Sequence, residues 1–240
     1  MQQLSYFELI GFGPNGWGNA LLIATGMTLA VALCGFIAGA VIGTLVAWAK
    51  LSSSIVARSL ADGYTTVLRG IPDLLVIYLF YFGGSAALGA IGSLFGAEGF
   101  IGMPAFVTGA IAIGIVSGAY QAEVFRGAFQ VVSRGELEAA RSVGMHRWLM
   151  FRRVVAPQVL RYAIPGLGNT WQLILKESAL ISVTGLVELL RQSHIAAGST
   201  RRPFDFYLTA AILYLLITWV STTLFQRAET YSMRGIRRAS

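Results

Sequence analysis

Long apolar stretches separated by short polar segments dominate the chain. The first runs from about Trp17 to Ala49, with no charged residue before Lys50. This length exceeds the roughly 20 residues that a helix needs to cross a bilayer. Four further stretches cover about Ile71 to Gly84, Pro104 to Ala122, Pro157 to Val187 and Phe206 to Phe225. The pattern predicts an all-α integral membrane protein with five transmembrane helices.

Glycines are concentrated in two parts of this pattern. Gly35, Gly39 and Gly43 recur every four residues and therefore share one helical face, which allows another helix to pack closely. The segment from Ser85 to Met103 is rich in glycine, and Glu98 is its only charged residue. We expect the first set to pack inside a helix bundle and the second segment to form an external loop.

Composition supports the membrane assignment independently. The chain is 55% hydrophobic and 12% charged, with a mean hydropathy of +0.67, whereas about a quarter of the residues of soluble domains are charged. Its 240 residues suit one bundle without an added soluble domain. The net charge is +7, and the basic residues responsible for it lie beside the apolar stretches. Membrane orientation therefore explains them better than nucleic-acid binding.

The basic residues also predict the orientation. Five spans leave the two ends on opposite sides of the membrane. Most basic residues then lie on one side: Lys50, Arg58, Arg69, the seven arginines from 126 to 161 and the four from 227 to 238. Only Arg191, Arg201 and Arg202 lie on the other side. Because cytoplasmic loops carry the excess of Lys and Arg, the N-terminus is predicted outside and the C-terminus inside.

This assignment divides the chain into three parts. Residues 1–16 form an external N-terminal segment, 17–227 the transmembrane domain and 228–240 a cytoplasmic basic tail.

The stretch 134–157 interrupts the apolar pattern. Its arginines cannot lie in hydrocarbon: Arg141, Arg147, Arg152 and Arg153. Two short helices are predicted, one from Glu136 to Val143 and one from His146 to Val155. Gly144 would close the first in a left-handed conformation, and Pro157 would stop the second. The small side chains of Ala139 and Ala140 would let another surface approach; a solvated charged loop is the alternative.

This stretch contains a motif that resembles one of a known protein family. Glu138-Ala139-Ala140, three residues, Gly144, nine residues and then Val154-Val155-Ala156-Pro157 resemble the EAA motif of ABC-transporter permeases. Val154 and Ala156 replace the usual isoleucine and leucine. Three further motifs, at 62–73, 118–127 and 166–176, resemble the polar amino-acid branch, in particular the Q-type permeases of histidine/lysine/arginine/ornithine and opine importers. The resemblance covers about Gly18 to Arg227.

The resemblance implies a fold, a location and partners. These are the type I ABC importer permease fold, the bacterial inner membrane, a second related permease chain or a second copy, and an external solute-binding protein. Two separate ATPase subunits would hold ATP and Mg, and loop 134–157 would be the coupling helix that docks into them. Within it the implied coupling residues are Glu138, Ala139, Ala140, Gly144 and Arg147. The implied function is ATP-driven import of polar amino acids, in particular basic ones or arginine-derived opines, by alternating access.

The fourth stretch carries the candidate substrate contacts. Asn169, Gln172 and Lys176 are spaced to share one helical face, with Glu177 on the adjoining stripe. Ionisable groups inside a membrane usually face a cavity or a partner. These residues could meet the charged groups of an amino acid, or they could hold a permease dimer together; the sequence leaves both open.

Two charge pairs are predicted near the membrane boundaries. Arg69 and Asp73 are four residues apart, and Glu123 and Arg126 are three apart, so each pair would be neighbours on a helix. We expect structural pairs; for the first, a role in the transport path is the alternative.

The chain also lacks several chemical motifs. It has no Gly-x-x-x-x-Gly-Lys-Ser/Thr phosphate loop, no Gly-x-Ser-x-Gly elbow, and no metal-ligand cluster around His146, His194 and Cys34. We therefore expect neither an enzyme nor a resident metal or cofactor. The alternative function is a secondary transporter in which Asp73, Lys176 and Glu177 relay ions, but the hydropathy repeats expected of it are absent.

Overall fold

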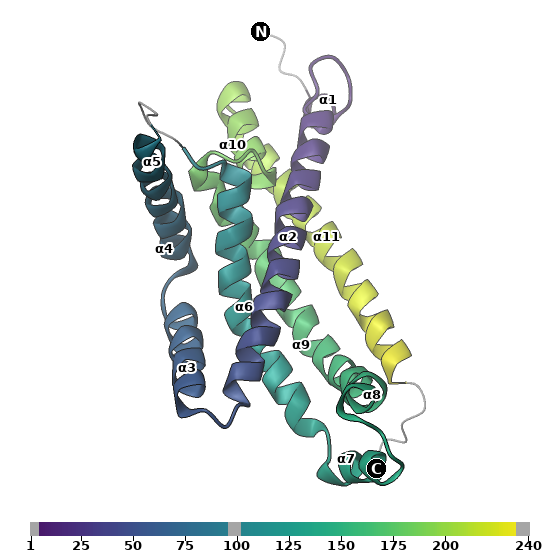
Figure 1. Cartoon of the computed structure of the whole chain (residues 1–240). Helices are drawn as coiled ribbons and strands as arrows, with labels where there is room; N and C mark the ends of the chain where they lie inside the picture. Colours follow the sequence, from purple (N-terminus) through teal and green to yellow (C-terminus); the bar gives the residue numbers. More distant parts are fainter. Residues whose placement is uncertain (1–4, 96–101, 234–240) are drawn as a thin grey trace.

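The computed structural model describes residues 5–95 and 102–233, and all regular structure in these ranges is helical. Long helices run side by side, and short helices lie at both ends of the bundle (Figure 1). The helices α1 (Tyr6–Ile10) and α10 (Leu189–Thr200) lie at one end, and α7 (Arg134–Ser142) and α8 (Arg147–Met150) at the other.

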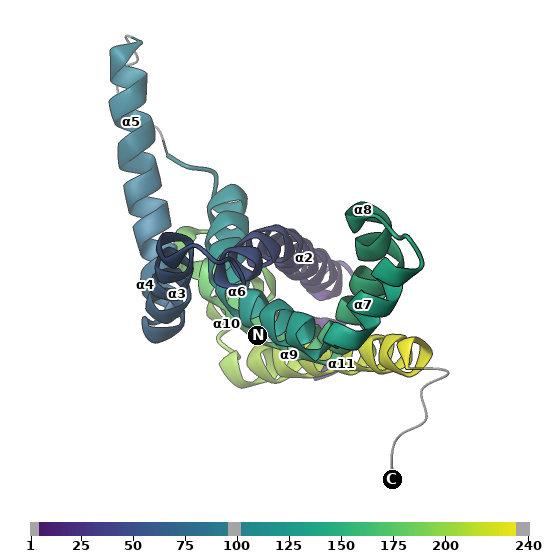
Figure 2. The ribbon, with the colours of Figure 1, turned by 60° about the horizontal axis from the view of Figure 1, so that its bottom comes forward.

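The long elements fall into two groups. The bundle contains α2 (Gly18–Lys50), α6 (Ala105–Val131), α9 (Ala156–Glu177) and α11 (Pro203–Ser232). A broken arm contains α3 (Ile55–Gly70), α4 (Asp73–Tyr78), the π-helical turn η1 (Leu79–Gly83) and α5 (Gly84–Leu94). Figure 2 shows the α5 end of the arm projecting away from the bundle.

Among the described residues, four helical segments are long and apolar enough to cross a membrane: α2, the segment Asp73–Leu94, α6 and α11. The fourth predicted span, α9, is not among them, because polar side chains such as Gln158, Arg161 and Gln172 are spread along it. It packs against α6, α11 and α2 within the bundle. Its apolar surroundings are therefore supplied largely by other helices.

The tightest packing lies between α2 and α6. Gly35, Gly39 and Gly43 are buried against α6, which confirms the predicted packing face. A Cβ at Gly39 would collide with the hydroxyl of Ser117. That hydroxyl donates a hydrogen bond to the carbonyl of Gly35 (3.1 Å). Polar groups thus add to the contact that the small residues permit.

The central core joins α2, α4, α6, α9 and η3 (Ser178–Thr184), a 3₁₀ helix. Its buried side chains include Val31, Ile77, Ile113, Ile174 and Ile181. The arm is therefore anchored to the bundle through α4.

The predicted loop from Ser85 to Met103 is wrong over its first part, because the arm continues as α5 to Leu94. Alanine and leucine favour this helix, and an apolar setting requires the backbone of even a glycine-rich segment to bond internally. Glu98 lies outside the described residues.

Two spans extend further than predicted. The helix α6 continues to Val131 instead of ending near Ala122, and α11 continues from Pro203 to Ser232. A helix does not need to end where the apolar pattern ends, since each added residue gains a backbone hydrogen bond. The first part of the predicted tail is thus helical, whereas Arg234, Arg237 and Arg238 lie outside the described residues.

The fourth predicted span does not run unbroken to Val187. The α-helix ends at Glu177, η3 follows, and Gly185 takes a left-handed conformation with φ 91°. The hydroxyls of Ser178 and Thr184 donate to the carbonyls three residues earlier, at 2.8 Å each. Such local bonds compete with regular α-helical pairing and accompany the tighter turn.

Gly39 should be far less tolerant of substitution than Gly26. Gly39→Val would force α2 and α6 apart and should destabilise the protein by at least about 1–3 kcal/mol, the usual cost of overpacking. At Gly26 nothing lies within 4 Å of an added Cβ, so Gly26→Val serves as the matched control. Thermal unfolding of the purified protein in detergent measures both; equal transition temperatures would contradict the packing account.

Candidate functional site

The first candidate region is the polar loop around α7 and α8. Ser133 and Glu136 form a capping box at the start of α7, each side chain accepting a hydrogen bond from the other's backbone N–H. The chain leaves α7 through Gly144, whose φ of 78° confirms the predicted left-handed closure. The amide of Met145 donates to the carbonyl of Ala140 (3.1 Å), which is the bond expected at such a helix end.

The predicted coupling residues lie mostly on the outside of this loop. Glu138, Ala139, Gly144 and Arg147 are exposed, whereas Ala140 is buried. Large apolar side chains accompany them: Val143 is 71% exposed and Trp148 66% exposed. We call the exposed residues Glu138, Ala139, Val143, Arg147 and Trp148 the loop surface. Apolar groups exposed beside charges are typical of protein–protein contacts.

Pro157 does not stop the second helix of the loop. A π-helical turn, η2 (Phe151–Val155), leads from α8 directly into α9, and Pro157 lies in the first turn of α9. A wider π-helical turn before this proline is one of the ways in which a continuous helix accommodates an interruption of its regular hydrogen bonds. The loop and α9 are therefore one connected body, as Figure 1 shows.

The second candidate region is a break in the arm. The helix α3 ends at Gly70, Ile71 and Pro72 are extended with ψ 149° and 132°, and α4 begins at Asp73. Figure 1 shows this break beside the middle part of α6. The predicted helical pair of Arg69 and Asp73 is therefore wrong, because proline forces the preceding residue out of the helical conformation.

Both of these residues contact other groups instead. The guanidinium of Arg69 lies 5.4 Å from the ring centroid of Tyr120 on α6, a cation–π arrangement. The carboxyl of Asp73 lies close enough to that of Glu177, at the end of α9, for the two groups to interact. Glu177 is only 9% exposed, and both carboxyl groups act electrostatically on Tyr120. We call Asp73 and Glu177 the acidic site.

The structure divides the predicted stripe on α9 into two sites. Asn169 and Gln172 line a cavity of about 290 Å³ between α9 and α11. Lys176 is exposed on the outside of this chain, whereas Glu177 is buried at the acidic site. Of the predicted stripe, Asn169 and Gln172 therefore share a cavity, whereas Lys176 and Glu177 lie elsewhere.

The remaining predicted pair is present. Arg126 bonds to Glu123, with 2.8 Å between Nη2 and a carboxylate oxygen. Glu123 also accepts from Lys50 at 2.5 Å, and Lys50 reaches Asp62 on α3 at 2.8 Å. These contacts join α2, α3 and α6 at one level of the bundle.

Sequence reasoning missed several members of these sites. Tyr120 belongs to one of the motifs quoted above, but nothing in its spacing indicates a partner on α3. Gln226 and Glu229, which line the α9–α11 cavity, are near the end of a predicted span and resemble ordinary interface residues. Within the described residues, no group of three His, Cys, Asp or Glu side chains is placed to hold a metal.

Comparison with known proteins decides the family. The pattern of the family described as "Binding-protein-dependent transport system inner membrane component" matches residues 35–238. The chain belongs to this family. It is therefore a multi-pass permease subunit of the inner membrane, which works with a substrate-binding protein and with an ATPase that is a separate subunit.

Relatives span nearly the whole chain. The octopine transport system permease protein OccQ of Rhizobium meliloti is 59% identical and covers 98% of this chain and 99% of its own. The nopaline transport system permease protein NocQ of Agrobacterium fabrum is 48% identical, covering 95% and 98%. The histidine/lysine/arginine/ornithine permease protein HisQ of Escherichia coli is 37% identical, covering 93% and 98%. The resemblance seen in the sequence is confirmed.

Solved structures agree with the fold. The crystal structure of an amino acid ABC transporter with histidines superposes with a TM-score of 0.74 at 33% identity, covering 90% of this chain and 95% of its own. An inward-facing MetNI methionine ABC transporter, at 16% identity and a TM-score of 0.68, covers 90% and 97% and shares the fold. The expected type I permease fold is confirmed, and the secondary-transporter alternative has no support among these proteins.

Proposed function

We propose that this permease carries arginine-derived opines or basic amino acids. The octopine and nopaline permeases among its relatives, and HisQ with its basic substrates, support this substrate class. These compounds share a guanidinium, ammonium or imidazole group together with at least one carboxylate. The pathway must therefore accommodate a cation within an apolar bundle.

The acidic site is the observation that carries the proposal. Two neighbouring carboxyl groups repel each other when both are ionised, so they favour either a shared proton or a bound cation between them. They lie where α3 and α4 are interrupted, and irregular backbone at membrane depth is tolerated only against protein or water. Asp73 and Glu177 would bind the cationic group as it passes, and Arg69 beside them could attract the carboxylate.

Transport would be driven through the loop surface. ATP and Mg would bind to two ATPase subunits, which would receive Glu138, Ala139, Gly144 and Arg147 in a surface cleft, while the buried Ala140 would support the loop from inside. The loop continues into α9, whose far end carries Glu177. Movement of the loop can therefore reach the acidic site along a single helix, which supports alternating access by rotation of the bundle.

The remaining assignments complete the proposed assembly. A second, related permease chain would form the other half of the pathway, and Lys176 is exposed on this chain where such a partner could lie. The N-terminus would be outside and the C-terminus in the cytoplasm, with residues 1–16, 17–227 and 228–240 as the three parts of the chain. The end of the bundle that carries α10 would then face the substrate-binding protein.

Substitution of Asp73 tests the substrate class. Asp73→Asn in the complete importer should lower ATP-dependent uptake of arginine and octopine roughly tenfold, since it removes one charge-assisted contact with the cation. Arg58→Gln is the control, because it also removes one charge from the same arm, at an exposed side chain that takes part in none of the ion pairs among the described residues. Uptake into proteoliposomes with ATP inside or outside is the measurement.

Two results would count against the proposal. One is uptake that the two variants reduce equally. The other is transport by this chain alone under an ion gradient without ATP, which would revive the secondary-transporter reading.

Substitution of Gly144 tests the coupling role. Gly144→Val should uncouple ATP hydrolysis from uptake, because a side chain strains the left-handed turn by roughly 1–2 kcal/mol and alters the loop's shape. Gly135→Val is the control, since Gly135 lies within α7 and, like Gly144, has nothing within 4 Å of an added Cβ. The ratio of substrate transported to ATP hydrolysed should fall severalfold in the first variant only; normal transport by Gly144→Val would refute the role.

A further inference from the structure

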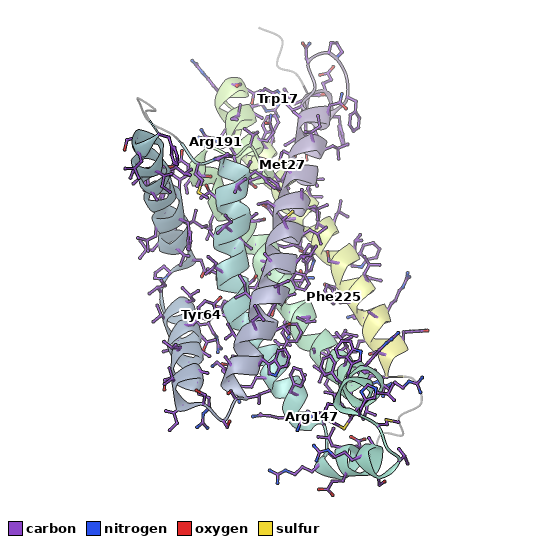
Figure 3. All side chains as sticks on the ribbon, in the orientation of Figure 1. Trp17, Met27, Tyr64, Arg147, Arg191 and Phe225 are labelled. Atoms are coloured by element: carbon purple, nitrogen blue, oxygen red, sulfur yellow. The ribbon has the colours of Figure 1, made fainter. Side chains whose placement is uncertain are left out.

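The cavity between α9 and α11 is distinct from the acidic site. Its polar lining comes from Asn169 and Gln172 on α9 and from Thr222, Gln226 and Glu229 on α11. Gln172 and Glu177 are five residues apart on α9, so they point about 140° away from each other. In Figure 3, Phe225 marks the cavity's part of α11, between the levels of Met27 and Arg147.

Gln172, one of the residues that line this cavity, carries an unpaired acceptor. The side-chain Nε2 of Gln172 donates to the hydroxyl of Thr222 at 3.0 Å, which fixes the orientation of the amide. Its Oε1 is buried and has no hydrogen-bond partner within the described part of the chain. A buried acceptor without a partner is costly, and native structures usually supply it with water or a ligand. A bound hydrogen-bond donor that reaches this oxygen when the lining side chains adjust would remove that cost.

The other polar groups of the cavity favour a cationic donor. Asn169 and Gln226 each offer an amide oxygen, and Glu229 offers a carboxylate that takes part in none of the ion pairs found among the described residues. A guanidinium carries five N–H donors and no acceptor, and its planar fork matches a carboxylate. The lining thus offers hydrogen-bond acceptors and a negative charge, which complement the donors and the positive charge of a guanidinium.

The apolar walls suit the rest of an arginine side chain. Phe225, Ile164 and Pro165 complete the lining. An added Cβ at Gly168 would lie 3.3 Å from the ring of Phe225, so this glycine allows the ring to lie close against α9. Aromatic faces attract guanidinium groups, and ligand pockets generally start at about 300 Å³. A cavity of about 290 Å³ therefore suits one alkylguanidinium end and not a whole opine.

The geometry points to an alkylguanidinium-binding site in the α9–α11 cavity, on the half of the permease nearer the coupling loop. It receives the arginine-like end of the substrate as a subsite separate from the acidic site. This inference rests on the proposed function, since it takes its ligand from the same substrate class and its inward position from the same orientation.

Protection of a thiol tests the site directly. The chain's one cysteine, Cys34, is exposed and is removed first by Cys34→Ser. Gln226→Cys then places a thiol at the cavity, and Gln130→Cys, on an exposed part of α6, is the matched control. Modification by a methanethiosulfonate reagent is followed in the complete importer in nanodiscs, with arginine as the probe and citrulline, its uncharged urea analogue, as the comparison.

Saturating arginine should slow modification at position 226 roughly tenfold, which is the scale of a bound ligand shielding its site. Citrulline should protect much less, and position 130 should react equally under all conditions. Glu229→Gln should abolish most of the protection, because it removes the carboxylate that would pair with the guanidinium. Equal protection by arginine and citrulline, or protection that survives Gln172→Leu together with Glu229→Gln, would overturn the site.

A second pair of measurements separates this inference from the proposed function. In Asp73→Asn with Glu177→Gln, arginine should still protect position 226, as expected of an independent subsite; loss of protection there would contradict that independence. If the unsubstituted importer takes up neither arginine nor octopine, the proposed function fails. If it takes them up but arginine never protects position 226, only the subsite fails.

Discussion

The backbone hydrogen bond is the constraint on which this structure depends. In hydrocarbon, every N–H and C=O must find a partner within the protein, so apolar stretches become uninterrupted helices. The helices α2, α6 and α11 comply over their whole lengths. Ile71 and Pro72 do not, and the acidic site lies beside them. At this break the backbone groups need hydrogen-bond partners from other parts of the protein or from water.

Close packing elsewhere makes this break possible. The glycines of α2 bring its backbone against α6, and α6 in turn positions the arm: the hydroxyl of Tyr64 donates to the carbonyl of Ile115 at 2.5 Å. Lys50 adds ion pairs to Asp62 and Glu123. A few directional contacts thus hold α3 against a rigid pair of helices. The arm is thus tied to these helices by directional contacts at α3 and by the apolar core at α4.

The sequence predicts the fold class well because membrane helices are long and chemically uniform. It predicts the closure at Gly144 because few residues other than glycine adopt a positive φ. The prediction fails where the local composition of a segment and its place in a long helix favour different structures. The glycine-rich α5 is helical, and the serine- and threonine-rich end of the fourth span forms the 3₁₀ helix η3.

Contacts between distant segments escape sequence reasoning altogether. By spacing, Asp73 looks like the partner of Arg69, yet Pro72 interrupts the helix between them. The residue that Asp73 interacts with is Glu177, which lies 104 positions after it in the sequence. The predicted stripe on α9 is geometrically sound, but only the neighbouring helices decide that Gln172 faces α11 and Glu177 faces α4. Side-chain spacing defines faces, whereas tertiary packing decides what each face meets.

The central claim is that the break between α3 and α4 lines a water-filled path that opens alternately to the two sides. Asp73→Cys and Leu75→Cys, each with Cys34→Ser, test it by labelling with a membrane-impermeant thiol reagent in the complete importer; Leu75 is 51% exposed on the outside of the chain. The account predicts that the thiol at position 73 reacts, with a rate that changes when ATP and vanadate trap the ATPases, whereas the thiol at position 75 stays unreactive. An unreactive position 73 in every state, or equal reaction at both positions, would contradict it.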